Sequence, residues 1–204
     1  MNTVHSNARP PRWAEAILRS LLKPGDRESV SGDLLEEYRE TIVPALGPAA
    51  DRWYVWQVGS FLFRASWSWG AVVGGALVIR YLFDTLVPVT DYRMRAATLS
   101  YTIIGACLFT GFSTAWRTRS MRVGVLVSFS AATLGALFSI VGAGVMLAIW
   151  HAPAELDRAQ NSGGLREGFI DVPLIVVALG VVLGTAGALL GKGLAAAFRS
   201  RSTP

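Results

Sequence analysis

Hydrophobic and polar residues are distributed unevenly along this chain of 204 residues. Up to about residue 52, charged and apolar residues alternate at helical spacing, whereas the chain from Trp53 to Phe198 is largely apolar. Two stretches, Ala96–Trp116 and Val123–Trp150, contain no charged residue. Each is long enough to cross about 30 Å of hydrocarbon as a helix. The pattern predicts an all-α integral membrane protein with a small N-terminal helical prefix.

Residues 1–67 form the predicted prefix, a cytoplasmic or interfacial domain of short helices. Pro11 can open a first helix, because the first turn leaves its missing N–H unpaired anyway. Pro24-Gly25 ends that helix, and Asp26 is expected to cap a second one. The apolar stripes of the two helices consist of Trp13, Ala14, Ile17, Leu18, Leu21 and Leu22, followed by Val30, Leu34, Tyr38 and Ile42. Gly32 inside the second helix is either a close helix–helix approach or a tolerated defect.

A third helix is predicted from about Pro48 to Trp67, and a four-helix transmembrane domain in residues 68–204. The tryptophans of the third helix suit the headgroup layer of a bilayer, so it is interpreted as an interfacial helix. The four spans are predicted at about 69–89, 96–116, 123–150 and 172–198. The third and fourth are long enough to tilt or to project from the bilayer.

The loop charges predict the orientation of the chain. The connection at 117–122 and the end of the chain at 192–201 carry three basic residues each and no acidic residue, whereas the connection at 151–171 has more acidic than basic residues. Basic residues favour the cytoplasmic side. Both termini are therefore expected in the cytoplasm of a bacterium, with the protein in its inner membrane. Arg93 and Arg95, in the first outer loop, oppose this assignment slightly.

Charge and cysteine content exclude several classes of protein. Residues 1–67 carry as many acidic as basic residues, so the net charge of +5 belongs to the membrane part. A nucleic-acid-binding protein would place a basic patch on its soluble domain, and none is expected here. Cys107 is the only cysteine, and His5 and His151 are far apart in the sequence. No disulfide, metal site or cofactor is predicted, and no nucleophile–base pair or phosphate-binding glycine loop points to an enzyme.

Small residues recur along one face of each of the last two spans. In the fourth span they are Gly180, Gly184, Gly187 and Gly191, and in the third they are Gly124, Ser128, Ala131, Gly135, Ser139 and Gly142. Small side chains allow helix backbones to approach closely. The face predicts a tight hairpin of spans three and four, with a homo-oligomer interface or a docking face for another membrane protein as the alternative.

Charged side chains provide two further candidate sites. Arg80 and Asp84 are spaced i, i+4 in the first span, so they share a helix face. They form either a structural ion pair or part of an ion or substrate path or partner contact. In the prefix, Asp33, Glu36, Glu37 and Glu40 form either a solvated face or an acidic docking surface for a basic partner.

The N-terminal stretch resembles a known family. The segments PPRWAEAILRSLLKPGDRESVSGDLLEEY and, from residue 51, DRWYVWQ are similar to the permease prefix domain, which precedes the membrane subunits of bacterial ABC exporters of the macrolide-exporter type. The resemblance covers about residues 10–67 and attaches no catalytic role to any residue. An exporter permease would add a large extracytoplasmic domain, whereas the first outer loop here is only TDYRMR.

The resemblance implies a non-enzymatic accessory or regulatory membrane protein associated with an ABC-type permease, in contact with membrane lipid. Two alternatives stay open. One is a small transporter or channel that uses Arg80 and Asp84. The other is a membrane sensor whose prefix binds a transcription regulator.

Overall fold

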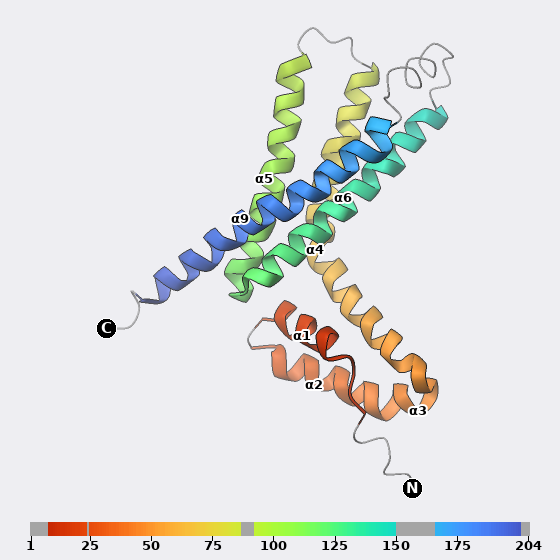
Figure 1. Cartoon of the computed structure of the whole chain (residues 1–204), viewed down its shortest axis with the longest axis vertical. Helices are drawn as coiled ribbons and strands as arrows, with labels where there is room; N and C mark the ends of the chain where they lie inside the picture. Colours follow the sequence, from red (N-terminus) through yellow and green to blue (C-terminus); the bar gives the residue numbers. More distant parts are fainter. Residues whose placement is uncertain (1–7, 24, 87–91, 150–165, 201–204) are drawn as a thin grey trace. The chain divides into compact units, whose positions relative to one another are not determined.

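The computed structural model of the chain consists of helices and divides into two compact units, Met1–Ala65 and Ser66–Pro204 (Figure 1). The structure describes residues 8–23, 25–86, 92–149 and 166–200. Each unit has its own hydrophobic core. The sequence placed a boundary between residues 67 and 68, close to the observed division.

The N-terminal unit contains α1 (Arg12–Leu21), α2 (Arg27–Glu37) and the beginning of α4 (Ala50–Leu86). Helices α1 and α2 lie side by side, with a short connection between them (Figure 1). Between α2 and α4 the chain forms a π-helical turn, η2 (Tyr38–Ile42), the short helix α3 (Val43–Leu46) and a 3-10 turn, η3 (Gly47–Ala49). The buried core of the unit consists of Ala14, Leu18, Tyr38, Ala50, Tyr54 and Val58.

Two arginines form hydrogen bonds to the segments that precede and follow α1. Arg27 Nε donates to the carbonyl oxygen of Leu22 at 3.2 Å, which satisfies a carbonyl group at the end of α1. Arg39 Nε donates to the carbonyl oxygen of Ala8 at 3.0 Å, which holds the segment before α1. Asp26 precedes α2 as expected, but its side chain makes no capping hydrogen bond, so that part of the prediction was wrong.

Gly32 lies on the exposed side of α2, and a methyl group added there would meet no atom within 4 Å. Gly32 is therefore not required by a close helix–helix approach. It is a tolerated defect in the helix, the second of the two explanations given above. Its substitution by alanine would remove the helix-propensity cost of about 1 kcal/mol.

The predicted division between an interfacial helix at about 48–67 and a first span at about 69–89 was wrong. The 37 residues of Ala50–Leu86 form one continuous α-helix. The sequence between Pro48 and Pro88 contains no proline, and Gly59 alone does not end a helix. The chain instead breaks at Gly47, whose φ of 51° lies in the left-handed region that glycine tolerates.

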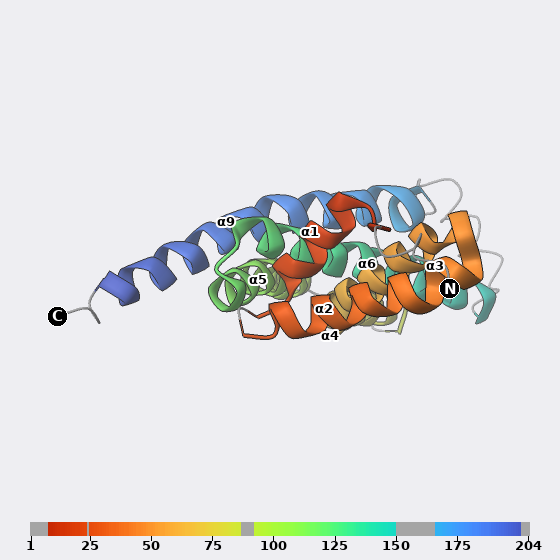
Figure 2. The ribbon, with the colours of Figure 1, turned by 90° about the horizontal axis from the view of Figure 1, so that it is seen from below.

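The second unit contains the rest of α4, α5 (Tyr92–Thr118), α6 (Met121–Ile149), a π-helical turn η4 (Glu167–Asp171) and α9 (Val172–Ser200). Helix α9 crosses α5 and α6 and packs against both, as Figures 1 and 2 show from two directions. Only Arg119 and Ser120 separate α5 from α6, and Arg119 adopts a φ of 57° to make this turn.

Three helical stretches of the described chain are long and apolar enough to cross a membrane: Arg27–Phe83, which includes most of α4, then Met121–Ile149 and Gly168–Phe198. The all-helical class with membrane-length helices is therefore confirmed. The remaining expected span, 96–116, lies within α5, and its crossing of the membrane stays a prediction.

Candidate functional site

The acidic residues singled out in the prefix lie together on the surface of the N-terminal unit. Asp33, Glu36 and Glu37 belong to α2, and Glu40 belongs to η2. All four side chains are exposed. Their spacing of three, four and seven residues places them on one side of the helix, so a partner would meet four carboxylates on a single surface.

Two tyrosines lie in the hydrophobic core of the same unit. Tyr38 and Tyr54 are both buried, and their rings meet edge to face at 5.6 Å between centroids. The Tyr38 hydroxyl group donates to Asp51 Oδ1 at 2.6 Å. Burial, together with this hydrogen bond and the charge of Asp51, raises the pKa of Tyr38 to about 12. The connection after α2 is therefore tied directly to the first turn of α4.

The Tyr54 hydroxyl group differs from that of Tyr38. It is buried and has no hydrogen-bond partner among the residues that the structure describes. Burial is the main cause that raises the pKa of Tyr54, the charge of Glu15 adds to it, and the charge of Arg19 opposes it. A buried hydroxyl group without a partner lowers the stability of the native state.

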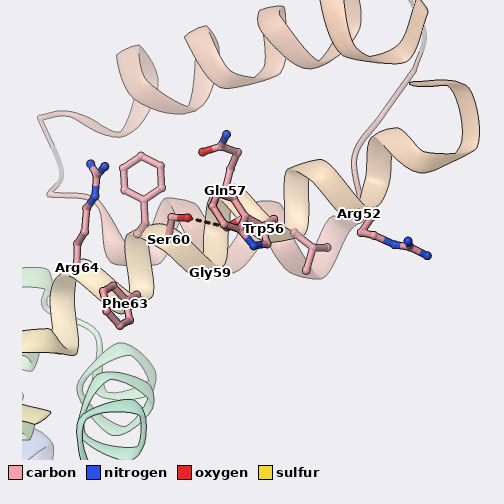
Figure 3. A pocket seen from close by; sticks show the side chains of 9 residues that line it. Arg52, Trp56, Gln57, Gly59, Ser60, Phe63 and Arg64 are labelled. Atoms are coloured by element: carbon pink, nitrogen blue, oxygen red, sulfur yellow. Dashed lines mark hydrogen bonds between the residues drawn. The ribbon is translucent and has the colours of Figure 1, made fainter. Parts of the chain in front are cut away.

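A groove of about 800 Å³ runs along α4 in the same unit, and sequence reasoning did not find it (Figure 3). Two arginines, Arg52 and Arg64, contribute to its lining, and no acidic residue does. The other lining residues are Val55, Trp56, Gln57, Gly59, Ser60, Phe61 and Phe63. The signal in the sequence was the helical spacing of Arg52, Trp56, Gly59 and Phe63, which alone does not distinguish an exposed face from a buried one.

The glycine face of α9 is occupied within the chain, and it faces two different helices. A methyl group on Gly180 or Gly184 would collide with Ala132 or Ser128 of α6. A methyl group on Gly187 or Gly191 would collide with the backbone carbonyl of Leu108 or Phe112 of α5. The expected hairpin of spans three and four thus accounts for half of the face, and α5 accounts for the rest.

The small residues of α6 pack against α4 as well as against α5 and α9. A methyl group on Gly135 or Gly142 would meet Val73 or Val78 of α4 at 2.5 or 2.6 Å. Ser128 Oγ, which is fully buried, lies 3.1 Å from the carbonyl oxygen of Cys107 and 3.0 Å from that of Gly180. This hydroxyl group of α6 therefore lies within hydrogen-bond distance of backbone carbonyl groups of both α5 and α9, and can donate to either.

The proposed pair in the first span is described only in part. Arg80 is half-buried on α4. Asp84 also belongs to α4, but its side chain lies outside the described residues, so the pair stays a prediction.

The described residues contain no group of three or more His, Cys, Asp and Glu side chains that could hold a metal ion. Cys107 is buried, and His5 and His151 lie outside the described residues. The expectation that the protein works without a metal or cofactor stays a prediction.

No protein-family model matches the chain, and comparisons with curated proteins and with solved structures gave no match. The resemblance of residues 10–67 to the permease prefix domain therefore stays a prediction. What defines this protein is its architecture, a small helical unit with its own core joined through α4 to a bundle of membrane-length helices.

Proposed function

We propose that this protein is a non-enzymatic accessory or regulatory protein of the bacterial inner membrane whose N-terminal unit binds a partner at the cytoplasmic side. The observation that carries the proposal is the exposed acidic surface of Asp33, Glu36, Glu37 and Glu40 on a unit with its own core. The partner of choice is an ABC-type permease, because the same unit resembles the permease prefix domain.

The membrane part supports a structural role more than a catalytic one. Its glycines and Ser128 are used in contacts between α4, α5, α6 and α9. Close contacts of this kind fix the relative position of membrane helices. We propose that the bundle serves as an anchor with four spans and that both termini are cytoplasmic, as the basic loop at 117–122 suggests.

The crossing of α5, which would complete the four spans, is supported by its packing. Leu108, Gly111 and Phe112 of α5 contact α9 along the stretch from Gly184 to Gly191. Helix α9 is itself long and apolar enough to cross a membrane. Because α5 packs closely against a helix that is long and apolar enough to cross, α5 is proposed to cross as well.

Site-specific photo-crosslinking in native membranes tests the partner proposal. A photoreactive amino acid in place of Glu36 should form an adduct with a permease subunit, identified by mass spectrometry. The matched control is the same substitution at Glu28, an exposed acidic residue of α2 that helical geometry places on another side of the helix. Adding Asp33→Lys and Glu40→Lys should remove the Glu36 adduct.

Three outcomes would contradict the proposal. Equal adducts from positions 28 and 36 would show that the acidic surface is not a specific site. A transcription regulator in the adduct would favour the membrane sensor. Solute flux through liposomes with the wild-type protein that is lost in a stable Arg80→Leu, Asp84→Leu double variant would favour the transporter or channel.

A further inference from the structure

Three arginines surround the α5–α6 turn: Arg117 near the end of α5, Arg119 in the turn itself and Arg122 in the first turn of α6. All three are exposed, and none forms an ion pair or a side-chain hydrogen bond with another described residue. Helices α5, α6 and α9 contain no acidic residue, so they bring no opposing charge to this turn. The charge of the turn therefore favours an anionic occupant.

Arg119 has a backbone conformation that arginine adopts only at a cost. Its φ of 57° lies in the left-handed region, where Cβ is crowded and glycine is the easiest residue to place. No other non-glycine residue in the described part of the chain has a positive φ. The turn is closed by backbone groups and by Thr118, whose hydroxyl oxygen accepts from the N–H of Ser120 at 3.4 Å. A guanidinium group that this turn does not use, at a position better suited to glycine, points to a ligand outside the chain.

Aromatic side chains of α5 and α9 lie beside the arginines. Trp116 directly precedes Arg117, and its ring stacks with that of Phe112 at 6.0 Å between centroids. It also meets the ring of Phe198 of α9 edge to face at 5.7 Å. Trp116 and Phe198 are both exposed. Tryptophan prefers the level of the lipid headgroups, where its ring is in apolar surroundings and its N–H reaches a polar group.

The arginines and Trp116 lie at one depth along the helices. Trp116 is two residues before the end of α5, and Arg122 is the second residue of α6, so each lies within about 3 Å of the turn along its helix axis. Helix α6 is long and apolar enough to cross a membrane, and α5 meets it at this turn (Figure 1). The headgroup layer is about 5–7 Å thick on each side of the hydrocarbon. One bilayer surface can therefore contact these four side chains together.

We propose that the α5–α6 turn binds the phosphate group of an anionic phospholipid, with Trp116 and Phe198 against its glycerol and upper acyl chain. Guanidinium groups donate paired hydrogen bonds to phosphate oxygens. A soluble phosphate compound would use the arginines but leave the rings without a role, which favours a lipid. The inference rests on the proposed function only in that α5 and α6 reach a bilayer surface at this turn. It does not involve the partner of the acidic surface.

Native mass spectrometry of the full chain in a neutral detergent tests the proposal. Phosphatidylglycerol and phosphatidylcholine are titrated separately, and the ratio of lipid-bound to lipid-free protein gives the affinity for each. The wild type should bind phosphatidylglycerol at least about fivefold more tightly, because phosphatidylcholine carries its own cation beside the phosphate. Arg119→Gln and Arg122→Gln should each lower the affinity for phosphatidylglycerol about fivefold, and the affinity for phosphatidylcholine much less.

The matched control is Arg166→Gln, which should leave both affinities unchanged. Arg166 is an exposed arginine of the same unit, but it pairs with Asp171 at 3.5 Å. It directly precedes η4, where a methyl group on Gly168 would lie 4.0 Å from Ala143. That position is about 30 Å along α6 from the α5–α6 turn.

Arg119→Gly separates lipid binding from folding. Glycine adopts the left-handed conformation at position 119 without strain, so this variant should unfold at or near the wild-type temperature in detergent without lipid. It should nevertheless lose affinity for phosphatidylglycerol as Arg119→Gln does. A loss of affinity in both variants with unfolding near the wild-type temperature assigns the effect to the guanidinium group.

Equal affinities of the wild type for the two lipids would overturn the proposal. A preference for phosphatidylglycerol that persists when Arg117, Arg119 and Arg122 are all replaced by glutamine would also overturn it, because the lipid would then bind elsewhere. Displacement of the lipid by an equal concentration of glycerol phosphate would assign the turn to a soluble phosphate compound. Photo-crosslinking at position 36 and reporters at the two termini test the proposed function independently of these titrations.

Discussion

The hydroxyl group of Tyr38 donates a 2.6 Å hydrogen bond to Asp51 Oδ1 and thereby joins the end of α2 to the start of α4. Tyr38 lies in the core and begins the turn that contains Glu40 of the acidic surface, whereas Asp51 is followed by Arg52 of the groove. This bond therefore connects the turn after the acidic residues of α2 to the helix that carries the groove.

Tyr38→Phe should destabilise the N-terminal unit by about 1 kcal/mol, the usual worth of such a hydrogen bond when the acceptor can return to water. Tyr54→Phe is the matched control, because it removes a buried hydroxyl group that has no hydrogen-bond partner among the described residues. Tyr54→Phe should therefore leave stability unchanged or raise it. Hydrogen exchange of the α1 and α4 amides in the full chain measures both. An equal loss from the two variants would contradict the role given to Asp51.

The burial of Tyr38, together with this hydrogen bond and the charge of Asp51, predicts a loss of stability at alkaline pH. The pKa of Tyr38 in the folded unit is about 12, above the ordinary value of 10.0. Folding therefore favours the protonated phenol, so the stabilisation is fully present below pH 10 and is lost as the pH rises from about 10 to 12. Burial shifts the pKa of Tyr54 in the same direction. Hydrogen exchange as a function of pH, corrected for the intrinsic rate, should show a weaker dependence in Tyr38→Phe than in the wild type.

Helical periodicity was sufficient to predict the short helices of the prefix. The stripe that includes Ala14 and Leu18 predicted α1, and both residues are fully buried. The continuity of α4 was missed because a tryptophan-rich stretch and a membrane-length stretch are both helical, and composition alone suggested a boundary between them. A boundary needs a residue that breaks the helix, and the sequence places that residue at Gly47.

Spacing predicted the glycine face of α9 but not its neighbours. Gly184 and Gly187 are three residues apart, yet one approaches Ser128 of α6 and the other approaches Leu108 of α5. Which helix a small residue faces depends on how three helices cross, and a sequence period carries no such information. The groove was missed for a similar reason: Trp56 is exposed because Tyr54 and Val58 take the buried side of α4.

The close contact between α5 and α9 can be tested with a pair of alanine substitutions. In Gly187→Ala the new methyl group collides with the carbonyl oxygen of Leu108, which is backbone and cannot move away cheaply. Overpacking of this kind costs about 1–3 kcal/mol. Gly193→Ala on the same helix meets no atom within 4 Å and gains helix propensity, so it should be neutral or slightly stabilising.

Thermal unfolding of the purified protein in detergent measures this difference. Gly187→Ala should unfold at a clearly lower temperature than the wild type, and Gly193→Ala should not. If both variants unfold together with the wild type, then α9 does not pack on α5 as closely as the structure has it.

The number of membrane crossings can be decided from the position of the two termini. If α5 crosses together with α4, α6 and α9, a reporter fused before Met1 and one fused after Pro204 should lie on the same side. If only the three other helices cross, the two reporters should lie on opposite sides. We expect the same side, the cytoplasm, because three arginines surround the α5–α6 turn at 117–122 and the close contacts of Gly187 and Gly191 hold α5 beside α9. A third reporter inserted at Ser120 should also be cytoplasmic, whereas one inserted at Asn161 should lie outside. A reporter at Ser120 on the outer side would remove α5 from the membrane, and with it the four-span anchor.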